Sequence, residues 1–337
     1  MCDMNVSSST RDLTTRATIQ IVTIQMTYYG PVLLLIVGIF GCLCNFLTFT
    51  SRQLRQNSCA FYFLCASVFE FLSITFGLIS RLAADHLGSN LQNTDRFYCK
   101  LRAYLVSAIP LIATYLILLS AIDRCMSSST HACLRSFSRI KNAYRSVIIA
   151  ILVALISCSH ILITYDLRPR CSTLVGTYAI FDGLFVVFWL GVIPHILMLI
   201  FGFITLLHIK RVRQRKFMEI PIDTITTSNR STPRPSHKTE RQLILMMLVQ
   251  VGLSSLLTLT RMIYYAYYIL GPPLKGYDKM IGSFLMSFTT LLYYSNYAKS
   301  FYIYTLTSRL FRTVFLQRLR KCTEAIFHIH RLSIKTT

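Results

Sequence analysis

The chain has 337 residues, of which 53% are hydrophobic and only 14% are charged. Soluble domains carry roughly 25% charged residues, so this composition excludes an ordinary soluble domain. The net charge of +22 would suggest a nucleic-acid partner in a soluble protein. Here the basic residues gather at the ends of long apolar segments, and we expect no nucleic-acid binding.

Seven apolar segments follow one another along the chain. Five are uncharged, and each of the other two is interrupted by a single charge, Glu70 or Lys299. The segments cover residues 17–51, 57–80, 103–122, 146–165, 183–209, 242–260 and 280–305. About 20 apolar residues let a helix cross a bilayer. We therefore predict an all-α membrane protein with a seven-transmembrane helix bundle over residues 28–305.

The basic residues predict the orientation of this bundle. Nine of the 35 lie between His208 and Arg241, and seven follow Tyr304, so the positive-inside rule places these segments in the cytoplasm. The tail 1–27 is then extracellular, and we expect a multi-pass protein of the plasma membrane. This tail has no apolar core of its own, which predicts no cleaved signal peptide. Asn5, in the sequence Asn-Val-Ser, is a glycosylation acceptor on the extracellular side.

Two of the eleven cysteines are predicted to pair. Most of the others lie inside apolar segments, where a cysteine behaves as a small hydrophobic residue. Cys99 begins the third segment, and Cys171 stands alone between the fourth and fifth. Two such cysteines in an oxidising compartment should form a disulfide. No Cys-x-x-Cys pair occurs, and we expect no metal and no cofactor.

The third segment ends on two adjacent opposite charges, Asp123 and Arg124. Cys99 precedes Arg124 by 25 residues, which is ~38 Å of helix. This length places the charged pair at the cytoplasmic mouth of the bundle, where we expect partial solvation. A charge is far less unfavourable there than at mid-membrane.

The composition of the remaining segments on the predicted cytoplasmic side indicates their structure. Residues 209–240 form a basic third loop, and residues 221–237 within it are rich in Pro, Ser and Thr, which predicts a flexible linker. Residues 306–337 are predicted to form an amphipathic helix on the lipid surface, followed by a tail. Cys322 is a candidate palmitoylation site, with an ordinary cysteine as the alternative.

The motifs, in their order, resemble those of the rhodopsin-like (class A) G-protein-coupled receptors over residues 28–322. The matching positions are Asn45 in "GIFGCLCN", Glu70 in "ASVFEFL", Cys99, Asp123 and Arg124 in "DRC", Pro194 in "GVIPHIL" and Tyr304 in "SFYIYTLTSRLFR". The stretches "ERQLILMMLVQV" and "TLTSRLF" look like the invertebrate neuropeptide (RFamide-type) branch of that family. The chain is divergent, because its fourth segment lacks the family's Trp, Thr260 stands for the proline of the sixth segment, and Ser300 with Phe301 replaces Asn-Pro.

The resemblance implies a receptor that binds an extracellular ligand and activates a heterotrimeric G protein. It assigns the switch to Asp123, Arg124, Glu240 and Tyr304, with Arg124 and Glu240 paired across the inner ends of the third and sixth segments.

The resemblance also implies a polar core within the bundle, made of Asn45, Glu70 and Asn296. The family binds sodium at this place, but Ala113 and Ser300 occupy two other positions of that site. A hydrogen-bonded carboxyl or a simple polar tether between helices are the alternatives.

The family's geometry also predicts a ligand pocket in the outer half of the bundle. Its expected residues are Arg81, Arg102, Arg261, Tyr264, Tyr268 and Phe288. Three converging guanidinium groups favour a ligand with a carboxylate, most simply a peptide; the alternative for Arg261 is snorkelling to the headgroups or pairing with Asp182. Val106 replaces the Asp of amine receptors, and Tyr294 replaces the retinal-binding Lys of opsins.

Three alternatives to a signalling receptor are an enzyme, a transporter and a non-signalling relative. An enzyme is not expected, because no nucleophile–base or paired-carboxylate constellation occurs at useful spacing. A seven-span transporter is the main rival, although the two halves show no internal repeat. A non-signalling chemosensory relative is the third alternative.

Overall fold

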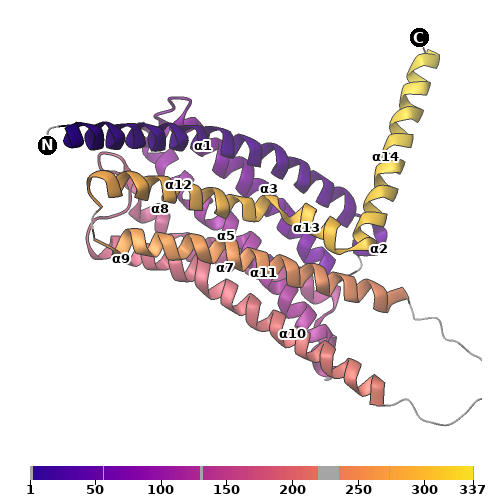
Figure 1. Cartoon of the computed structure of the whole chain (residues 1–337). Coiled ribbons are helices and arrows are strands. Elements are labelled where there is room, and N and C mark those ends of the chain that lie inside the picture. Colours follow the sequence, from indigo (N-terminus) through magenta and orange to yellow (C-terminus); the bar gives the residue numbers. More distant parts are fainter. Residues whose placement is uncertain (1–2, 56, 130–131, 219–234, 273, 337) are drawn as a thin grey trace, which may run out of the picture.

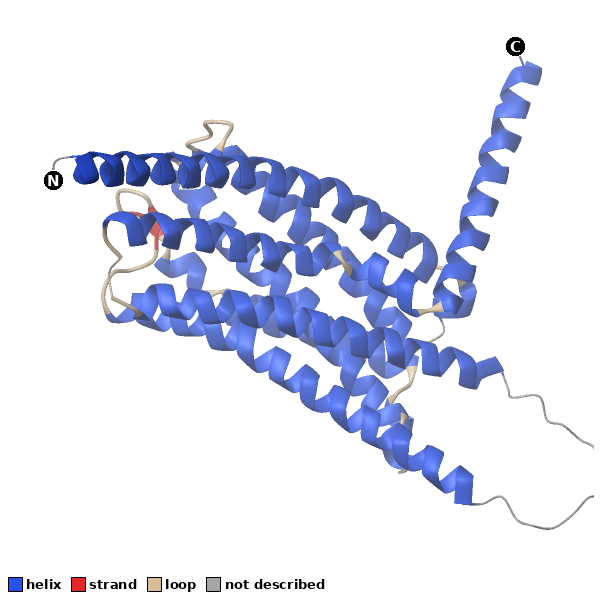
Figure 2. Cartoon of the chain, in the orientation of Figure 1, coloured by secondary structure: helices blue, strands red, loops and turns tan. Residues whose placement is uncertain are grey.

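The structure is a computed structural model that describes residues 3–55, 57–129, 132–218, 235–272 and 274–336, with side chains described except at 3–13, 53, 55, 132, 137, 212–218, 235–240 and 325–336. Long helices lie side by side along one direction, and one further helix leaves the bundle at a steep angle (Figures 1 and 2). The long helices are α1 (Asp3–Phe49), α3 (Ser58–Asp85), α5 (Arg96–Ser127), α7 (Ile140–Cys158), α10 (Ile193–Met218), α11 (Pro235–Leu270), α12 (Gly276–Ala298) and α14 (Arg309–Thr336).

Shorter elements connect the long helices. They are α2 (Arg52–Arg55), α4 (Leu91–Thr94), α6 (Ala132–Phe137), α8 (His160–Thr164), β1 (Asp166–Leu167), β2 (Cys171–Ser172), α9 (Thr177–Leu184), a π-helical stretch (Phe185–Val192) and α13 (Ser300–Thr307). The disulfide end of the bundle carries β1 and β2, and the α14 end is the opposite one, where α14 departs (Figure 1).

Six helical segments in the described part are long and apolar enough to cross a membrane. They are Thr14–Phe49, Ser58–Asp85, Arg96–Ser127, Ile140–Thr164, Thr177–Arg211 and Arg241–Leu270. Their outward faces carry large apolar side chains, as expected of helices in contact with lipid. The chain is therefore an all-helical, multi-pass membrane protein. α12 is not among the six, but it packs between α1 and α11.

α5 lies at the centre of the bundle. It contacts α3, α7, α10 and α11, and its buried side chains extend from Cys99 to Arg124. Many of these side chains are small, and Ala108, Ala113 and Ala121 are fully buried. Small residues let neighbouring helices approach closely where no water drives them together.

Besides the turn at Ser159 between α7 and α8, two irregularities interrupt the helices of the described part, and the first has a local cause. Pro194 has no N–H and its ring would clash with the carbonyl one turn earlier, and the π-helical stretch Phe185–Val192 ends just before it. The second irregularity is the boundary between α12 and α13 at Lys299. By contrast, α11 runs from Pro235 to Leu270 as one element.

The start of α14 is fixed by a side chain of α11. Gln242 Oε1 accepts hydrogen bonds from Ser308 Oγ at 3.0 Å and from the backbone N–H of Leu310 at 2.6 Å. The first N–H groups of a helix lack partners within the helix, so this amide satisfies one of them. Phe311 then packs its ring against Phe49 at a centroid distance of 5.2 Å.

The predicted pairing of Cys99 with Cys171 is confirmed. The two residues form a disulfide with a Cα–Cα distance of 5.7 Å, and Cys171 pairs with Leu167 in the β1–β2 hairpin. Arg96 donates to Asp166 of the hairpin at 2.6 Å. The backbone N–H of Leu167, followed by the Arg96 guanidinium, holds the pKa of the Asp166 carboxyl below its usual range.

The helix boundaries differ from the predicted domain boundaries at three places. α1 begins at Asp3 rather than near residue 28. The third loop is shorter than 209–240, because α10 continues to Met218 and α11 begins at Pro235. Residues 219–234 lie outside the described part.

We expect Cys171→Ser to lower the midpoint of thermal unfolding of the purified protein. Losing the bond frees a long loop and the end of α5 that carries Cys99. The double variant Cys99→Ser/Cys171→Ser should unfold at the same temperature as either single variant, because all three lack the same bond. Cys133→Ser removes an exposed thiol and is the control. Recovery of Cys99 and Cys171 as free thiols in non-reducing peptide mapping would contradict the pairing.

Candidate functional site

Asp123 and Arg124 form a buried ion pair near the α14 end of α5. Arg124 donates to Asp123 Oδ2 from Nη2 at 2.6 Å and from Nε at 3.1 Å. Arg124 Nη2 also lies 3.3 Å from Asn57 Oδ1 and from Ser58 Oγ. These contacts join the end of α5 to the beginning of α3.

The Asp123 carboxylate is saturated with donors. Besides Arg124, Oδ2 accepts from Ser58 Oγ at 2.9 Å, and Oδ1 accepts from Ser138 Oγ at 2.7 Å. The side chains of Asp123 and Arg124 are only 6% and 3% exposed. The expected partial solvation is therefore wrong, because α3 and the segment before α7 cover the pair. The side chain of Glu240 lies outside the described part, and its pairing with Arg124 stays a prediction.

The predicted polar core is brought together around Ser300 rather than by direct contact of its members. Ser300 Oγ donates to Glu70 Oε2 at 2.6 Å and accepts from Asn45 Nδ2 at 3.3 Å. Glu70 is 1% exposed and Asn45 is fully buried. A residue that departs from the family motif thus connects α1, α3 and α13.

Lys299 is a member of this core that was not among the predicted site residues. Its ammonium group donates to Asn296 Oδ1 at 2.5 Å, to the Asn296 carbonyl at 2.9 Å and to Ser254 Oγ at 2.9 Å. It also interacts electrostatically with Glu70. The core therefore holds one acidic and one basic side chain, which form no direct ion pair within 4.0 Å. The signal in the sequence was the single Lys that interrupts the seventh apolar segment.

Tyr304 lies in an aromatic cluster between the core and the α14 end of the bundle. It is 1% exposed, and its ring lies 5.0 Å from Phe63, 5.6 Å from Phe49 and 5.8 Å from Phe311. The cluster joins α1, α3, α13 and α14. Any movement of α13 would therefore disturb the packing of four elements.

Arg261 lies in the half of α11 towards the disulfide end, largely surrounded by aromatic and sulfur atoms. Its guanidinium lies 4.9 Å from the centroid of the Tyr265 ring, and Nη1 is 2.9 Å from the sulfur of Met286. In the described part no carboxylate lies within 4.0 Å of Arg261. The guanidinium is thus held by weak acceptors alone.

Arg81, Arg102 and Arg261, the three arginines of the predicted pocket, all lie within electrostatic range of the hydroxyl of Tyr294, which is buried on α12. Arg81 has a carboxylate partner, Asp85, at 3.2 Å. The Nε of Arg102 is buried without a hydrogen-bond partner among the described residues. The result is a positive cluster, which we call the arginine cluster (Arg81, Arg102 and Arg261).

The aromatic residues predicted for this pocket do not all lie beside the arginine cluster. Tyr264 donates to the Gly282 carbonyl at 2.9 Å and ties α11 to α12. Tyr268 and Phe288 are 45% and 43% exposed, so they do not line a buried cluster. Tyr265, Tyr293 and Tyr294 surround Arg261 instead. The sequence did not show which tyrosines turn towards Arg261, because tyrosines occur on several faces of α11 and α12.

Asp182 does not pair with Arg261, which removes one of the alternatives for that arginine. The Asp182 carboxylate is 4% exposed, accepts from Tyr165 OH at 3.0 Å and lies 3.8 Å from His160 Nε2. Phe185 packs edge-on against the His160 ring at 4.5 Å. This group ties α8 to α9.

The next observations concern the predicted glycosylation, palmitoylation and metal sites. The side chain of Asn5 lies outside the described part, although the backbone there belongs to α1. Cys322 is an exposed free cysteine on α14. Within the described residues no group of three or more His, Cys, Asp or Glu side chains could hold a metal ion.

Comparison of the chain with protein-family models and with curated proteins finds no match.

We expect Glu70 and Lys299 to be energetically coupled. Glu70→Gln or Lys299→Met alone leaves one buried charge without its counter-charge, and each should lower the free energy of unfolding by about 3 kcal/mol. The double variant should be less destabilised than the sum of the two, because neither charge remains. The measurement is a double-mutant cycle of thermal unfolding in detergent.

The matched control for this cycle is Arg81→Met with Asp85→Asn. That pair is also an Arg/Lys–carboxylate pair, but its side chains are 26% and 44% exposed, and we expect little coupling there. Strict additivity of Glu70→Gln and Lys299→Met would show that the two charges do not depend on each other.

Proposed function

We propose that this protein is a G-protein-coupled receptor with a seven-transmembrane bundle and an amphipathic eighth helix. In this proposal α12 is the seventh span and α14 begins as the eighth helix. The N-terminus is extracellular, the C-terminus is cytoplasmic, and the protein acts in the plasma membrane. Its partners are an extracellular ligand, membrane lipids and a heterotrimeric G protein.

The observation that carries this proposal is the course of α5. One continuous helix holds Cys99 at the disulfide end and Asp123 with Arg124 at the α14 end. Its length over Arg96–Ser127 corresponds to ~48 Å. The arginine cluster and the buried ion pair are therefore joined through a helix that contacts most of the others. Such an element transmits a movement at one end to the other end.

The arginine cluster supports a ligand that carries an anionic group. Arg261 has only sulfur and aromatic partners, and Arg102 has a buried N–H without an acceptor. A carboxylate or acidic side chain would supply acceptors to both through charge-assisted hydrogen bonds. A peptide with an acidic residue or a free C-terminus fits this chemistry. An RFamide-type ligand does not, because its arginine and its amide offer no anion.

The buried charges of the core support one rival function. A carboxylate and an ammonium group in the middle of a membrane bundle are typical of ion and proton pathways in transporters. Transporters commonly have broken helices at the substrate site, and the boundary between α12 and α13 at Lys299 suits this rival. Against it, α5 and α11 are each continuous, and the two halves of the sequence show no internal repeat.

The test of the proposed function is a screen of the expressed protein against a peptide library, with G-protein activation as the readout. Once an agonist is found, Arg261→Ala should lower its potency at least tenfold, because a buried charge-assisted hydrogen bond contributes ~1.5–3 kcal/mol. Arg261→Lys should lose part of the potency, because an ammonium group cannot form a bidentate contact.

Arg170→Ala is the matched control, since it removes an exposed arginine near the same end of the molecule. A purely cationic agonist, or unchanged potency in both Arg261 variants, would contradict the anionic ligand. Solute uptake by the protein in liposomes, without G-protein activation by any peptide, would favour the transporter.

The proposed switch also predicts how a variant should signal without ligand. If Glu240 pairs with Arg124 at rest, Glu240→Ala should raise ligand-free signalling several-fold, because a contribution of ~1 kcal/mol shifts a two-state equilibrium by about that factor. The measurement is basal G-protein activation at matched surface expression. Glu324→Ala removes an exposed acid on α14 and serves as the control. Equal basal activity in the two variants would argue against the pair.

A further inference from the structure

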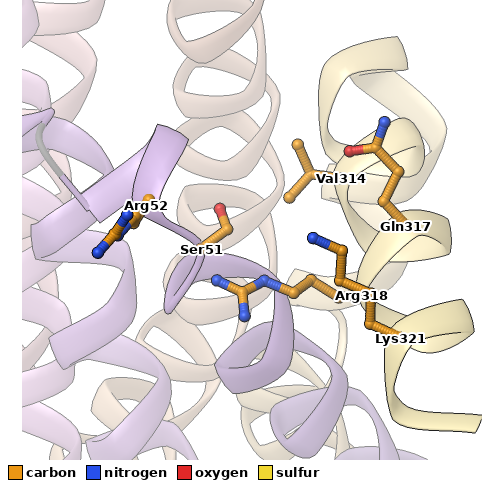
Figure 3. Close-up of a pocket in the computed structure, with 6 residues that line it drawn as sticks. All are labelled: Ser51, Arg52, Val314, Gln317, Arg318 and Lys321. Carbon is orange, nitrogen blue, oxygen red and sulfur yellow. The ribbon is translucent and has the colours of Figure 1, made fainter. Parts of the chain in front are cut away.

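A pocket lies at the α14 end of the bundle, between the junction of α1 with α2 and the first turns of α14 (Figure 3). Its volume is about 370 Å³. The lining residues are Ser51, Arg52, Val314, Gln317, Arg318 and Lys321. Nothing in the proposed signalling mechanism uses this pocket.

Ser51 is the buried polar group of this pocket. The residue is only 5% exposed, and its hydroxyl has no hydrogen-bond partner among the described residues. A buried hydroxyl without a partner is unfavourable, because it has lost its hydrogen bonds to water. A hydroxyl in this situation, at the wall of a pocket, indicates a ligand atom or a water opposite it.

Two cationic side chains reach from α14 towards Ser51. Figure 3 shows Arg318 and Lys321 extending across the pocket from the α14 side, whereas Arg52 lies at its far side. Arg318 is held in place by a hydrogen bond from Nη2 to the Thr50 carbonyl at 3.2 Å. One wall therefore presents positive charge, and the opposite wall presents a hydroxyl.

The positive charge of the pocket is not neutralised by the protein. In the described part no carboxylate lies within 4.0 Å of Arg52, Arg318 or Lys321. The one acid on α14 is Glu324, which is exposed and lies beyond Lys321 in the chain. Three cations and one hydroxyl match the oxygens of a phosphate group.

We propose that the pocket formed by Ser51, Arg52, Arg318 and Lys321 binds a phosphate group, as carried by the headgroup of an anionic phospholipid or by a soluble inositol phosphate. The lipid is the favoured source. Val314 gives the pocket an apolar wall. An apolar wall beside cationic side chains suits a headgroup that continues into acyl chains.

The test uses the full-length protein in detergent with short-chain phosphatidylinositol 4,5-bisphosphate as the probe, and lipid binding is measured by native mass spectrometry. The double variant Arg318→Gln/Lys321→Gln should lose about tenfold in affinity, since each basic residue near an anionic headgroup contributes several-fold. Ser51→Ala should lose a smaller factor, about threefold, because it removes one neutral donor.

The matched control is Arg312→Gln/Arg320→Gln, which removes the same charge from exposed positions of the same helix that do not line the pocket. Its affinity should change less than twofold. An equal loss in the two double variants would overturn the proposal, because the lipid would then respond to the overall charge of α14. An unchanged affinity of the Arg318→Gln/Lys321→Gln variant would overturn it as well.

A competition arm separates the two sources of phosphate. Inositol 1,4,5-trisphosphate is added to the wild-type protein with the lipid bound. Retention of the lipid, together with the loss in the pocket variant, assigns the site to a membrane headgroup. Displacement of the lipid assigns it to the phosphate group alone, whether lipid-borne or soluble. Because no ligand-dependent signalling is measured, the result is independent of the proposed receptor function.

Discussion

Every charge inside this apolar bundle needs a partner, because neither lipid nor packed side chains can replace water around an ion. Asp123 meets this requirement with Arg124 and two serines, and Glu70 meets it with Ser300 and Lys299. The contacts that satisfy the charges also hold α5 against α3 and α13 against both α1 and α3. The same contacts therefore stabilise the buried charges and determine how these helices pack.

Arg261 has no carboxylate partner among the described residues. Its partners are the ring face of Tyr265 and the thioether of Met286, and Arg81 and Arg102 lie within electrostatic range of the same buried hydroxyl, that of Tyr294. Like charges gathered in a site of low polarity destabilise one another. A protein retains such an arrangement when an external anion completes it. This imbalance, rather than the apolar bundle as a whole, underlies the proposal of an acidic ligand.

The irregular positions of the bundle are not where the family resemblance would place them. The sixth segment lacks an interior proline, and α11 is accordingly uninterrupted. The helical backbone is irregular instead in the π-helical stretch before Pro194 and at the boundary at Lys299. Movement in the proposed receptor would therefore be expected at the start of α10 and between α12 and α13. The latter boundary adjoins both the buried charge pair and the aromatic cluster around Tyr304.

The sequence by itself determined the helical class, six of the seven predicted membrane-crossing segments and the pairing of Cys99 with Cys171, because long apolar runs and isolated cysteines are local signals. The tertiary structure alone decided which side chains meet. It buried Asp123 and Arg124, joined Lys299 to the core, turned Phe288 to the surface and left Ser51 facing cations of α14. The physical reason is helical phase: in a membrane bundle both the lipid face and the core face are apolar, so hydrophobicity does not mark the face that turns inward.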